Sequence, residues 1–336
     1  MDINECISPF LQLGKRLRSM RPDAWRRLVD RVGVQNPWFT EEQITLGFSG
    51  LNRYLEEEKL TGWLHGYPAR MSSPKTVGLI MAGNIPLVGF HDLLCVLLSG
   101  HNAMIKLSRD DSILIPFIID NLADIDERFR KRISIAERLK DYDAVIATGS
   151  DNSARYFEYY FSKVPHIIRK NRTSVAILRG DEIQSDLRCL ADDVFQYFGL
   201  GCRNVAKAFV PEDFDAGLLL DSFEPFKHYL DHHKYANNYY YRRSVYAVNR
   251  VHYLDSGFCL VVETPELFSP ISVLYTETYK SIEALEVAIG ERRTKIQCIV
   301  SKDAWYPDST GFGKSQQPEL WDYADDVDTM QFLLGL

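Results

Sequence analysis

The chain has 336 residues, of which 46% are hydrophobic and 25% charged, and this composition excludes a disordered or fibrous protein. A single hydrophobic core seldom grows beyond about 250 to 300 residues, so the length predicts two domains. The formal net charge of -7 argues against a dedicated nucleic-acid-binding protein.

The N-terminal residues 1–6 contain neither a basic leader nor an apolar segment, so we expect no secretory signal and a cytoplasmic protein. No stretch approaches the roughly 18 uninterrupted apolar residues of a membrane span, because the most apolar candidate, 85–99, contains His91 and Asp92. The six cysteines are widely spaced and form no CxxC pair, so we expect neither a disulfide scaffold nor a metal site.

The first half of the chain alternates between short apolar strands and helices. A helical, charged segment over 8–59 and a loop over 71–74 precede the first strand, 76–82, which leads into a helix ending at Gly100. The pattern continues with a strand over 103–106, a helix over 113–129, a strand over 143–147 and a helix over 152–162. This alternation predicts a parallel sheet covered on both faces.

Polar residues follow these predicted strands. Asn84 comes after the first strand, Lys106 closes the second, and 148–150 (Thr-Gly-Ser) follow the third. Parallel sheets bind ligands at the carboxyl ends of their strands. Gly149 and Ser150 precede a helix whose free N–H groups are suited to a pyrophosphate, but they are also ordinary turn and cap residues, and no GxGxxG is present.

The second half begins near Arg179. Its predicted elements are an amphipathic helix over 185–198 and strands over 258–263, 271–275 and 296–300, after a strand over 173–178 that closes the first half. We expect one domain over 1–179, a second, α/β domain over 180–318, and a tail over 319–336 that either returns to the first domain or contributes to a subunit interface.

Cys202 is the cysteine whose neighbours suggest chemistry. It follows the amphipathic helix on a turn that contains Gly199 and Gly201. Such a turn exposes a thiol to substrate while the helix fixes its position, which suits a nucleophile; the alternative is a buried, inert thiol. Cys95, Cys259 and Cys298 lie in apolar runs and are expected in the core.

Four fragments in order along the chain resemble the aldehyde dehydrogenase superfamily over about residues 76–315. The segment 82–86 resembles the family's Asn-aromatic-Pro segment, which implies that Asn84 helps form an oxyanion hole. The segment 99–108 is similar to the family's strand ending Lys-Pro-Ser, which implies that Lys106 binds the adenosine ribose and that Ser108 lies beside it.

The other two fragments complete the implied cofactor site. Thr148, Gly149 and Ser150 match the family's Thr-Gly-Ser at the pyrophosphate. Glu266 and Phe268 match its Glu-x-Phe-Gly-Pro segment at the nicotinamide ribose. The resemblance implies an aldehyde dehydrogenase-like fold, with a Rossmann-type cofactor domain and an α/β catalytic domain that carries Cys202 as the nucleophile.

Two departures from the family pattern refine the expected reaction. The family's general-base glutamate should fall near 167–172, which contains no carboxylate, and this argues for reduction or transfer of an acyl thioester rather than its hydrolysis. Arg109 replaces a glutamate that binds the ribose hydroxyls in many members, and a cation there suits the 2′-phosphate of NADP. The cofactor is therefore expected to be NADP or NAD.

The segments 311–318 and 320–325 resemble short acyl-CoA reductases of the bioluminescence fatty acyl reductase (LuxC) type. The resemblance implies NAD(P)H-dependent reduction of an acyl-CoA or other acyl thioester to an aldehyde, by an enzyme that forms a homodimer. Reduction of an acyl phosphate and a noncatalytic binding or assembly role on the same fold are the alternatives.

Two further segments have structural interpretations. The tyrosine-rich segment 232–243 is expected to line a subunit interface or a substrate cleft rather than bind nucleic acid or a metal. The acidic residues between 322 and 328 lack the spacing of a calcium loop and are expected to form a solvated face.

Overall fold

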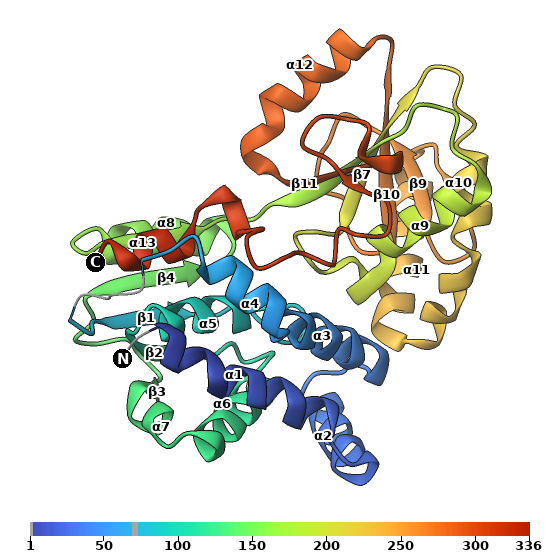
Figure 1. The fold of residues 1–336 in the computed structure, drawn as a ribbon. Coiled ribbons are helices and arrows are strands. Elements are labelled where there is room, and N and C mark those ends of the chain that lie inside the picture. Colours follow the sequence, from blue (N-terminus) through green and yellow to red (C-terminus); the bar gives the residue numbers. More distant parts are fainter. Residues whose placement is uncertain (1–2, 69–72) are drawn as a thin grey trace. The chain divides into compact units, whose positions relative to one another are not determined.

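The computed structural model describes residues 3–68 and 73–336; the chain start at 1–2 and part of the predicted loop over 71–74 lie outside the described residues. The chain divides into two compact units. Unit 1 comprises Met1–Asn171 and Pro318–Leu336, and unit 2 comprises Arg172–Gln317. Each unit is built on its own sheet (Figure 1).

The described part of unit 1 contains a five-stranded, all-parallel sheet in the order β3-β2-β1-β4-β5. Its strands are β1 (Thr76–Ile80), β2 (Asn102–Lys106), β3 (Ile133–Ile135), β4 (Ala144–Thr148) and β5 (His166–Arg169). The predicted parallel sheet is confirmed. The strand order reverses between β1 and β4, and sheets of this kind bind ligands outside the carboxyl ends of the strands at that point.

The helices of unit 1 are α1 (Ile3–Arg18), α2 (Pro22–Gln35), α3 (Glu41–Tyr54), α4 (Glu57–Leu64), α5 (Phe90–Leu98), α6 (Leu114–Ile125), α7 (Arg128–Arg132), α8 (Asp151–Phe161) and α13 (Thr329–Leu334). The N-terminal helices share one hydrophobic core with the sheet helices, since Phe10 and Ile44 are fully buried in the same cluster as Leu97 and Ile118. The C-terminal helix α13 packs against α5.

Unit 2, all of whose residues are described, contains a seven-stranded sheet in the order β12-β11-β6-β7-β10-β9-β8, in which the β8–β9 pair is antiparallel. Its strands are β6 (Thr173–Ile177), β7 (Val205–Pro211), β8 (Leu254–Asp255), β9 (Leu260–Glu263), β10 (Val273–Tyr279), β11 (Ile296–Ser301) and β12 (Thr310–Gly311). Its helices are α9 (Gln184–Phe195), α10 (Gly217–Ser222), α11 (His233–Asn249) and α12 (Ile282–Arg292).

Several element boundaries differ from the sequence predictions. The domain boundary predicted near Arg179 places β6 in the first domain. In the structure β6 pairs with β7 and β11, so it belongs to unit 2. The helix predicted over 113–129 is divided into α6 and α7, because Asp126 adopts an extended conformation. The helix predicted to follow the first strand and to end at Gly100 begins at Phe90 and ends at Leu98, after a turn in which Leu87 has a φ of 61°.

None of the helices in residues 3–68 and 73–336 is long and apolar enough to cross a membrane.

Candidate active site

Cys202 lies in the loop between α9 and β7, and its side chain is exposed. The hydroxyl of Ser174 on β6 donates a hydrogen bond to the Cys202 carbonyl at 3.1 Å. By contrast, Cys95 and Cys259 are buried, as their apolar sequence context predicts. Burial raises the pKa of both of these thiols well above its usual range, so neither is a ready nucleophile.

The turn before Cys202 has an unusual backbone. Tyr197, Phe198 and Gly199 have φ values of 54°, 58° and 75°, and the predicted helix over 185–198 therefore ends at Phe195. For bulky side chains this conformation costs about 1 to 3 kcal/mol per residue and persists only where the surroundings enforce it. Here aromatic packing enforces it, because the Phe198 ring centroid lies 4.3 Å from that of Tyr229.

The tyrosine-rich segment supplies part of this aromatic packing. The ring of His232 lies 4.7 Å from that of Phe198, and Tyr235 and Tyr239 are buried. The expectation that the segment lines an interface or a cleft is therefore wrong for these two tyrosines, which belong to the interior of unit 2. Tyr240 and Tyr241 are exposed on α11.

Asn204 ties the Cys202 loop to the end of α9. Its Oδ1 accepts a hydrogen bond from the Gly201 N–H at 2.7 Å. Its Nδ2 donates to the carbonyls of Asp193, Val194 and Gln196 at 3.1, 3.3 and 2.8 Å. Helix ends leave such carbonyls without intrahelical partners, so one buried side chain both caps α9 and holds the loop. The sequence signal for it was an asparagine two residues after the cysteine.

Asp193 brings the C-terminal glycine-rich segment to the same end of α9. Its Oδ2 accepts the Gly313 N–H at 2.7 Å and its Oδ1 accepts the Ser315 N–H at 2.9 Å. Burial raises the pKa of Asp193 to about 6. A Cβ placed on Gly201 would lie 3.7 Å from the amide atoms of Gln316, so this segment reaches the nucleophile loop. The Gln316 Nε2 is buried and has no hydrogen-bond partner among the described residues.

Asn84 is exposed in the loop after β1, which Asp111 holds in place. The Asp111 Oδ2 accepts the Leu87 N–H at 2.9 Å, and burial raises the pKa of this carboxyl to about 6. A Cβ on Gly83 would lie 2.5 Å from the Ser108 Oγ, so only glycine fits there. The structure therefore brings the loop of Asn84 and the loop of Ser108 together at the carboxyl edge of the sheet.

The other predicted cofactor residues of unit 1 lie along this edge. Lys106 is exposed at the end of β2, beside Ile80 at the end of β1, and Arg109 is exposed in the following loop. The half-buried Ser108 accepts the Asp110 N–H through its hydroxyl at 3.2 Å. On both sides of the β1 strand, polar residues thus end the neighbouring strands β2 and β4.

The Thr-Gly-Ser segment joins β4 to α8. Ser150 is the N-cap of α8 and its hydroxyl accepts the Ser153 N–H at 3.3 Å, so the capping interpretation holds for its side chain. A Cβ on Gly149 would lie 2.9 Å from atoms of both Ser153 and Phe157, and glycine therefore permits the close packing of α8. Thr148, the last residue of β4, is half-buried.

Glu266 and Phe268 lie in unit 2, in the loop between β9 and β10. Both are exposed, and the buried Leu267 between them anchors the loop. Cys202, Glu266 and Phe268 are thus residues of unit 2, whereas Asn84 and the other predicted cofactor residues belong to unit 1.

The segment in which the family's general base is expected forms β5 and the residues after it. Arg169 on this strand is buried and forms an ion pair with Asp92 on α5. Its Nη2 also donates to the Thr329 hydroxyl at 3.0 Å. A buried cation with structural partners therefore occupies this strand.

The acidic residues near the C-terminus are in part structural. Asp328 caps α13 by accepting the Gln331 N–H at 2.8 Å, and it also accepts a hydrogen bond from the Tyr67 hydroxyl at 2.8 Å. Asp322 accepts the Glu319 N–H at 2.8 Å. Asp326 is exposed, as expected for a solvated acidic face.

Comparison with solved structures shows the fold. An aldehyde dehydrogenase from Mycobacterium tuberculosis, complexed with NAD+, is similar with a TM-score of 0.66 and 15% identity over 90% of this chain and 73% of that chain. A cysteine-to-alanine mutant of the Pseudomonas syringae indole-3-acetaldehyde dehydrogenase AldA, in complex with NAD+ and IAA, is similar with a TM-score of 0.66. The identity is 11%, and the match covers 92% of this chain and 74% of that chain. A mutant of aldehyde dehydrogenase C from the same species, complexed with NAD+ and octanal, has a TM-score of 0.63 and 11% identity over 88% and 71%.

Comparison at the sequence level is more specific. No curated protein matches the chain. Residues 50–216 match the family model described as acyl-CoA reductase (LuxC), and this span includes Asn84, the Thr-Gly-Ser segment and Cys202. The match confirms the resemblance found in the sequence, and the chain belongs to the LuxC-like acyl-CoA reductase branch of the aldehyde dehydrogenase superfamily.

Proposed function

We propose that this protein reduces an acyl-CoA, or another acyl thioester, to an aldehyde with NAD(P)H through a thioester on Cys202. The observation that carries the proposal is the exposed Cys202 on a loop fixed by Asn204, within the span that matches the acyl-CoA reductase family. The net reaction converts acyl-CoA, NAD(P)H and a proton into aldehyde, CoA and NAD(P)+.

In the first step the Cys202 thiolate attacks the thioester carbonyl and expels the CoA thiolate, which takes up a proton. In the second step a hydride adds to the carbonyl carbon of the enzyme thioester, and collapse of the tetrahedral oxyanion expels the Cys202 thiolate and releases the aldehyde. Bound NAD(P)H supplies that hydride, because no protein side chain donates one. Both oxyanions need hydrogen-bond donors, for which we propose the Asn84 amide and the Cys202 backbone N–H.

The residues of unit 1 fit a dinucleotide. Lys106 and Arg109 place two exposed cations at the carboxyl edge of the sheet, and the N-terminus of the eleven-residue helix α8 begins at the same edge. Helix N-termini of this kind favour phosphate groups. We propose Lys106 and Ser108 for the adenosine ribose, Arg109 for a 2′-phosphate, and Thr148 to Ser150 for the pyrophosphate, with NADPH preferred to NADH. We propose Glu266 and Phe268 for the nicotinamide ribose.

The fate of the thioester follows from the missing base. Hydrolysis would require a carboxylate to activate water, and residues 166–172 contain only His166 and basic or neutral side chains, with Arg169 engaged by Asp92. We therefore propose that the thioester is consumed by hydride rather than by water. An acyl phosphate is the alternative acyl donor, and a noncatalytic binding or assembly role is the alternative function.

The test is aldehyde release from a panel of acyl-CoA thioesters of increasing chain length, with NADPH and separately with NADH. An acyl phosphate of each chain length forms a second arm. The proposal expects aldehyde from thioesters, faster with NADPH. Aldehyde from acyl phosphates alone would mean that the acyl donor is an acyl phosphate rather than a thioester. No aldehyde with any donor would favour the noncatalytic alternative.

A cytoplasmic location and a homodimer, both expected from the sequence, are further parts of the proposal. Cell fractionation tests the first, and light scattering during size-exclusion chromatography tests the second.

A further inference from the structure

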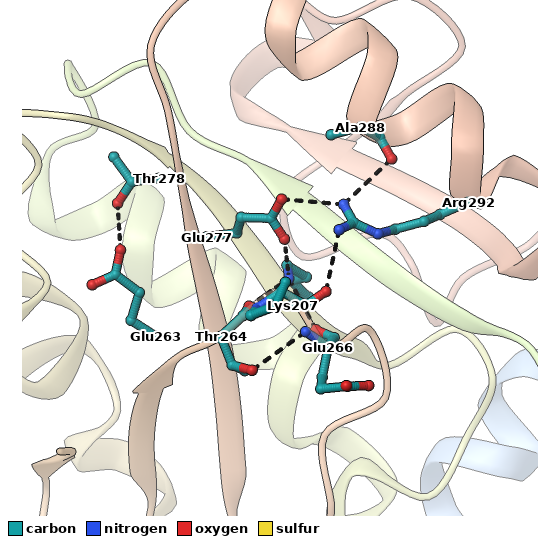
Figure 2. A network of polar contacts seen from close by, with 9 residues as sticks. Lys207, Glu263, Thr264, Glu266, Glu277, Thr278, Ala288 and Arg292 are labelled. Carbon is teal, nitrogen blue, oxygen red and sulfur yellow. Dashed lines mark hydrogen bonds and ion pairs between the residues drawn. The ribbon is translucent and has the colours of Figure 1, made fainter. Parts of the chain in front are cut away.

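Lys207 is a fully buried lysine on β7, five residues after Cys202. Its Nζ donates hydrogen bonds to the carbonyls of Thr264 and Glu266 at 2.7 and 2.9 Å, and it forms an ion pair with Glu277 (Figure 2). Burial lowers the pKa of Lys207 below its usual range. Lysines are almost never fully buried without partners, so this side chain requires an explanation.

A second cation completes the network. Arg292 on α12 forms an ion pair with Glu277 at 3.2 Å, and its Nη2 donates to the Pro265 carbonyl at 3.2 Å. The three consecutive carbonyls of 264–266 are therefore held by two cations that share one carboxylate, as Figure 2 shows. Taking these charges out of water carries a large desolvation penalty that their pairing has to offset, which makes such a network a weak source of stability.

The network holds the loop that carries the proposed contact to the nicotinamide ribose. The Glu266 carbonyl is bound by Lys207, whereas the Glu266 side chain is exposed and extends away from the network (Figure 2). The strand that supplies Lys207 begins directly after the nucleophile loop, which Asn204 closes. One strand thus follows the nucleophile and fixes the backbone from which Glu266 projects.

We propose that Lys207 is a positioning residue for hydride transfer, which sets the place of Glu266 through its backbone carbonyl and takes no part in forming the thioester on Cys202. The inference rests on the proposed function and on the role proposed there for Glu266. Displacing a positioned group by about 1 Å commonly slows a reaction up to about 100-fold. We therefore expect the loss of Lys207 to slow hydride transfer, the step that uses Glu266, by a measurable factor.

The experiment separates the two chemical steps in the full-length protein. Intact-mass spectrometry gives the rate of acyl adduct formation from acyl-CoA without cofactor, rapid mixing with NADPH gives the single-turnover rate of adduct loss, and titration gives the NADPH dissociation constant. The variants are Lys207→Met, Lys207→Arg and Arg292→Gln. The matched control is Thr278→Val, which removes the 3.0 Å bond to Glu263 on the neighbouring strands without touching the loop over 264–266 (Figure 2).

For Lys207→Met we expect adduct formation within about threefold of wild type and a 10- to 100-fold slower adduct loss or a correspondingly weaker NADPH affinity, about the cost of a misplaced contact. We expect Lys207→Arg to retain most of the wild-type rate of adduct loss and NADPH affinity. We expect Arg292→Gln to slow adduct loss more than adduct formation, by a smaller factor than Lys207→Met, and the control variant to behave as wild type. Arg292 is partly exposed, so its variant reports on the network even if Lys207→Met fails to fold.

An equal slowing of both steps in Lys207→Met and Arg292→Gln, or an unchanged adduct loss and NADPH affinity, would overturn the inference. Failure of the proposed function is a separate result, in which the wild type itself forms no adduct. In that case the NADPH dissociation constants of the same variants still decide whether Lys207 positions a cofactor-binding loop.

Discussion

The Oδ1 atom of Asn204 accepts the backbone N–H of Gly201 at 2.7 Å, one residue before the proposed nucleophile Cys202. The same side chain donates through Nδ2 to three carbonyls at the end of α9. The loop of Cys202 is therefore fastened to the helix that precedes it by the two ends of one buried amide. This relationship makes the two roles of Asn204 separable by substitution.

Asn204→Ala removes every one of these bonds and leaves buried backbone groups unsatisfied. We expect a loss of stability of about 1 to 3 kcal/mol or more, together with slower acylation of Cys202. Thermal unfolding and the rate of acyl adduct formation measure the two effects.

Asn204→Asp keeps an oxygen for the Gly201 N–H but cannot donate to the helix carbonyls. We expect it to lose stability as well, while a folded fraction retains more of the acylation rate than Asn204→Ala does. Equal acylation rates in the two variants would show that the bond to Gly201 does not position the nucleophile.

Asn84→Ala tests the proposed oxyanion donor. Because Asn84 is exposed, we expect the thermal midpoint to stay within a few degrees of wild type, while the rate of aldehyde formation falls about 100 to 1000-fold. The exposed Asn249, at the end of α11, provides a matched control through Asn249→Ala. A rate of aldehyde formation for Asn84→Ala within about threefold of the control would show that Asn84 is not an oxyanion donor.

Asp111 predicts a pH dependence of stability. Burial raises the pKa of this carboxyl to about 6, above the value of about 3.9 in an unfolded chain. The folded state therefore binds the proton more tightly, so the stability linked to this group is fully present below about pH 4 and is lost as the pH rises through about 6. A shift of about two pKa units corresponds to a loss of at most about 2 to 3 kcal/mol.

The measurement is the thermal midpoint between pH 4.5 and 7.5 for the wild type, Asp111→Asn and the exposed neighbour control Asp110→Asn. We expect a smaller decline with rising pH in Asp111→Asn than in the other two proteins, although its loss of one backbone acceptor lowers the midpoint at every pH. Identical slopes in all three proteins would mean that Asp111 does not titrate in this range. Asp193, whose pKa burial also raises to about 6, contributes with the same sign.

Ser150→Asp distinguishes capping from phosphate binding. Aspartate is as good an N-cap as serine, so we expect α8 and the thermal midpoint to be preserved. A carboxylate beside a bound pyrophosphate repels it. Because the two negative groups would lie only a few ångströms apart near the protein surface, we expect the NADPH dissociation constant to rise about tenfold or more. An unchanged dissociation constant would leave Ser150 as a cap alone.

Much of the fold could be predicted because buried parallel strands are continuous apolar runs. β1, β4 and β11 lie close to where their sequence patterns place them. β7 escaped prediction because Lys207 interrupts its apolar run, and only the partners supplied by the distant residues Thr264, Glu266 and Glu277 make a lysine acceptable there. The short strands β3 and β5 carry too few apolar residues to form a pattern.

The candidate site divides in the same way. Local signals marked Cys202 and Asn84, each on a loop directly after a patterned element. Asp111, which holds the loop of Asn84, and Asp193, which holds the C-terminal glycine-rich segment, resemble ordinary polar surface residues in the sequence. Their role depends on backbone groups as far away as Gly313, 120 residues along the chain from Asp193, and no local pattern reports such a pairing.

The most direct test of the central claim is the intact mass of the wild type and of Cys202→Ala after incubation with acyl-CoA thioesters, without and then with NADPH. We predict an acyl adduct on the wild type alone, which disappears with NADPH as aldehyde is released. An adduct of equal extent on Cys202→Ala, or no adduct on the wild type with any thioester, would contradict the account.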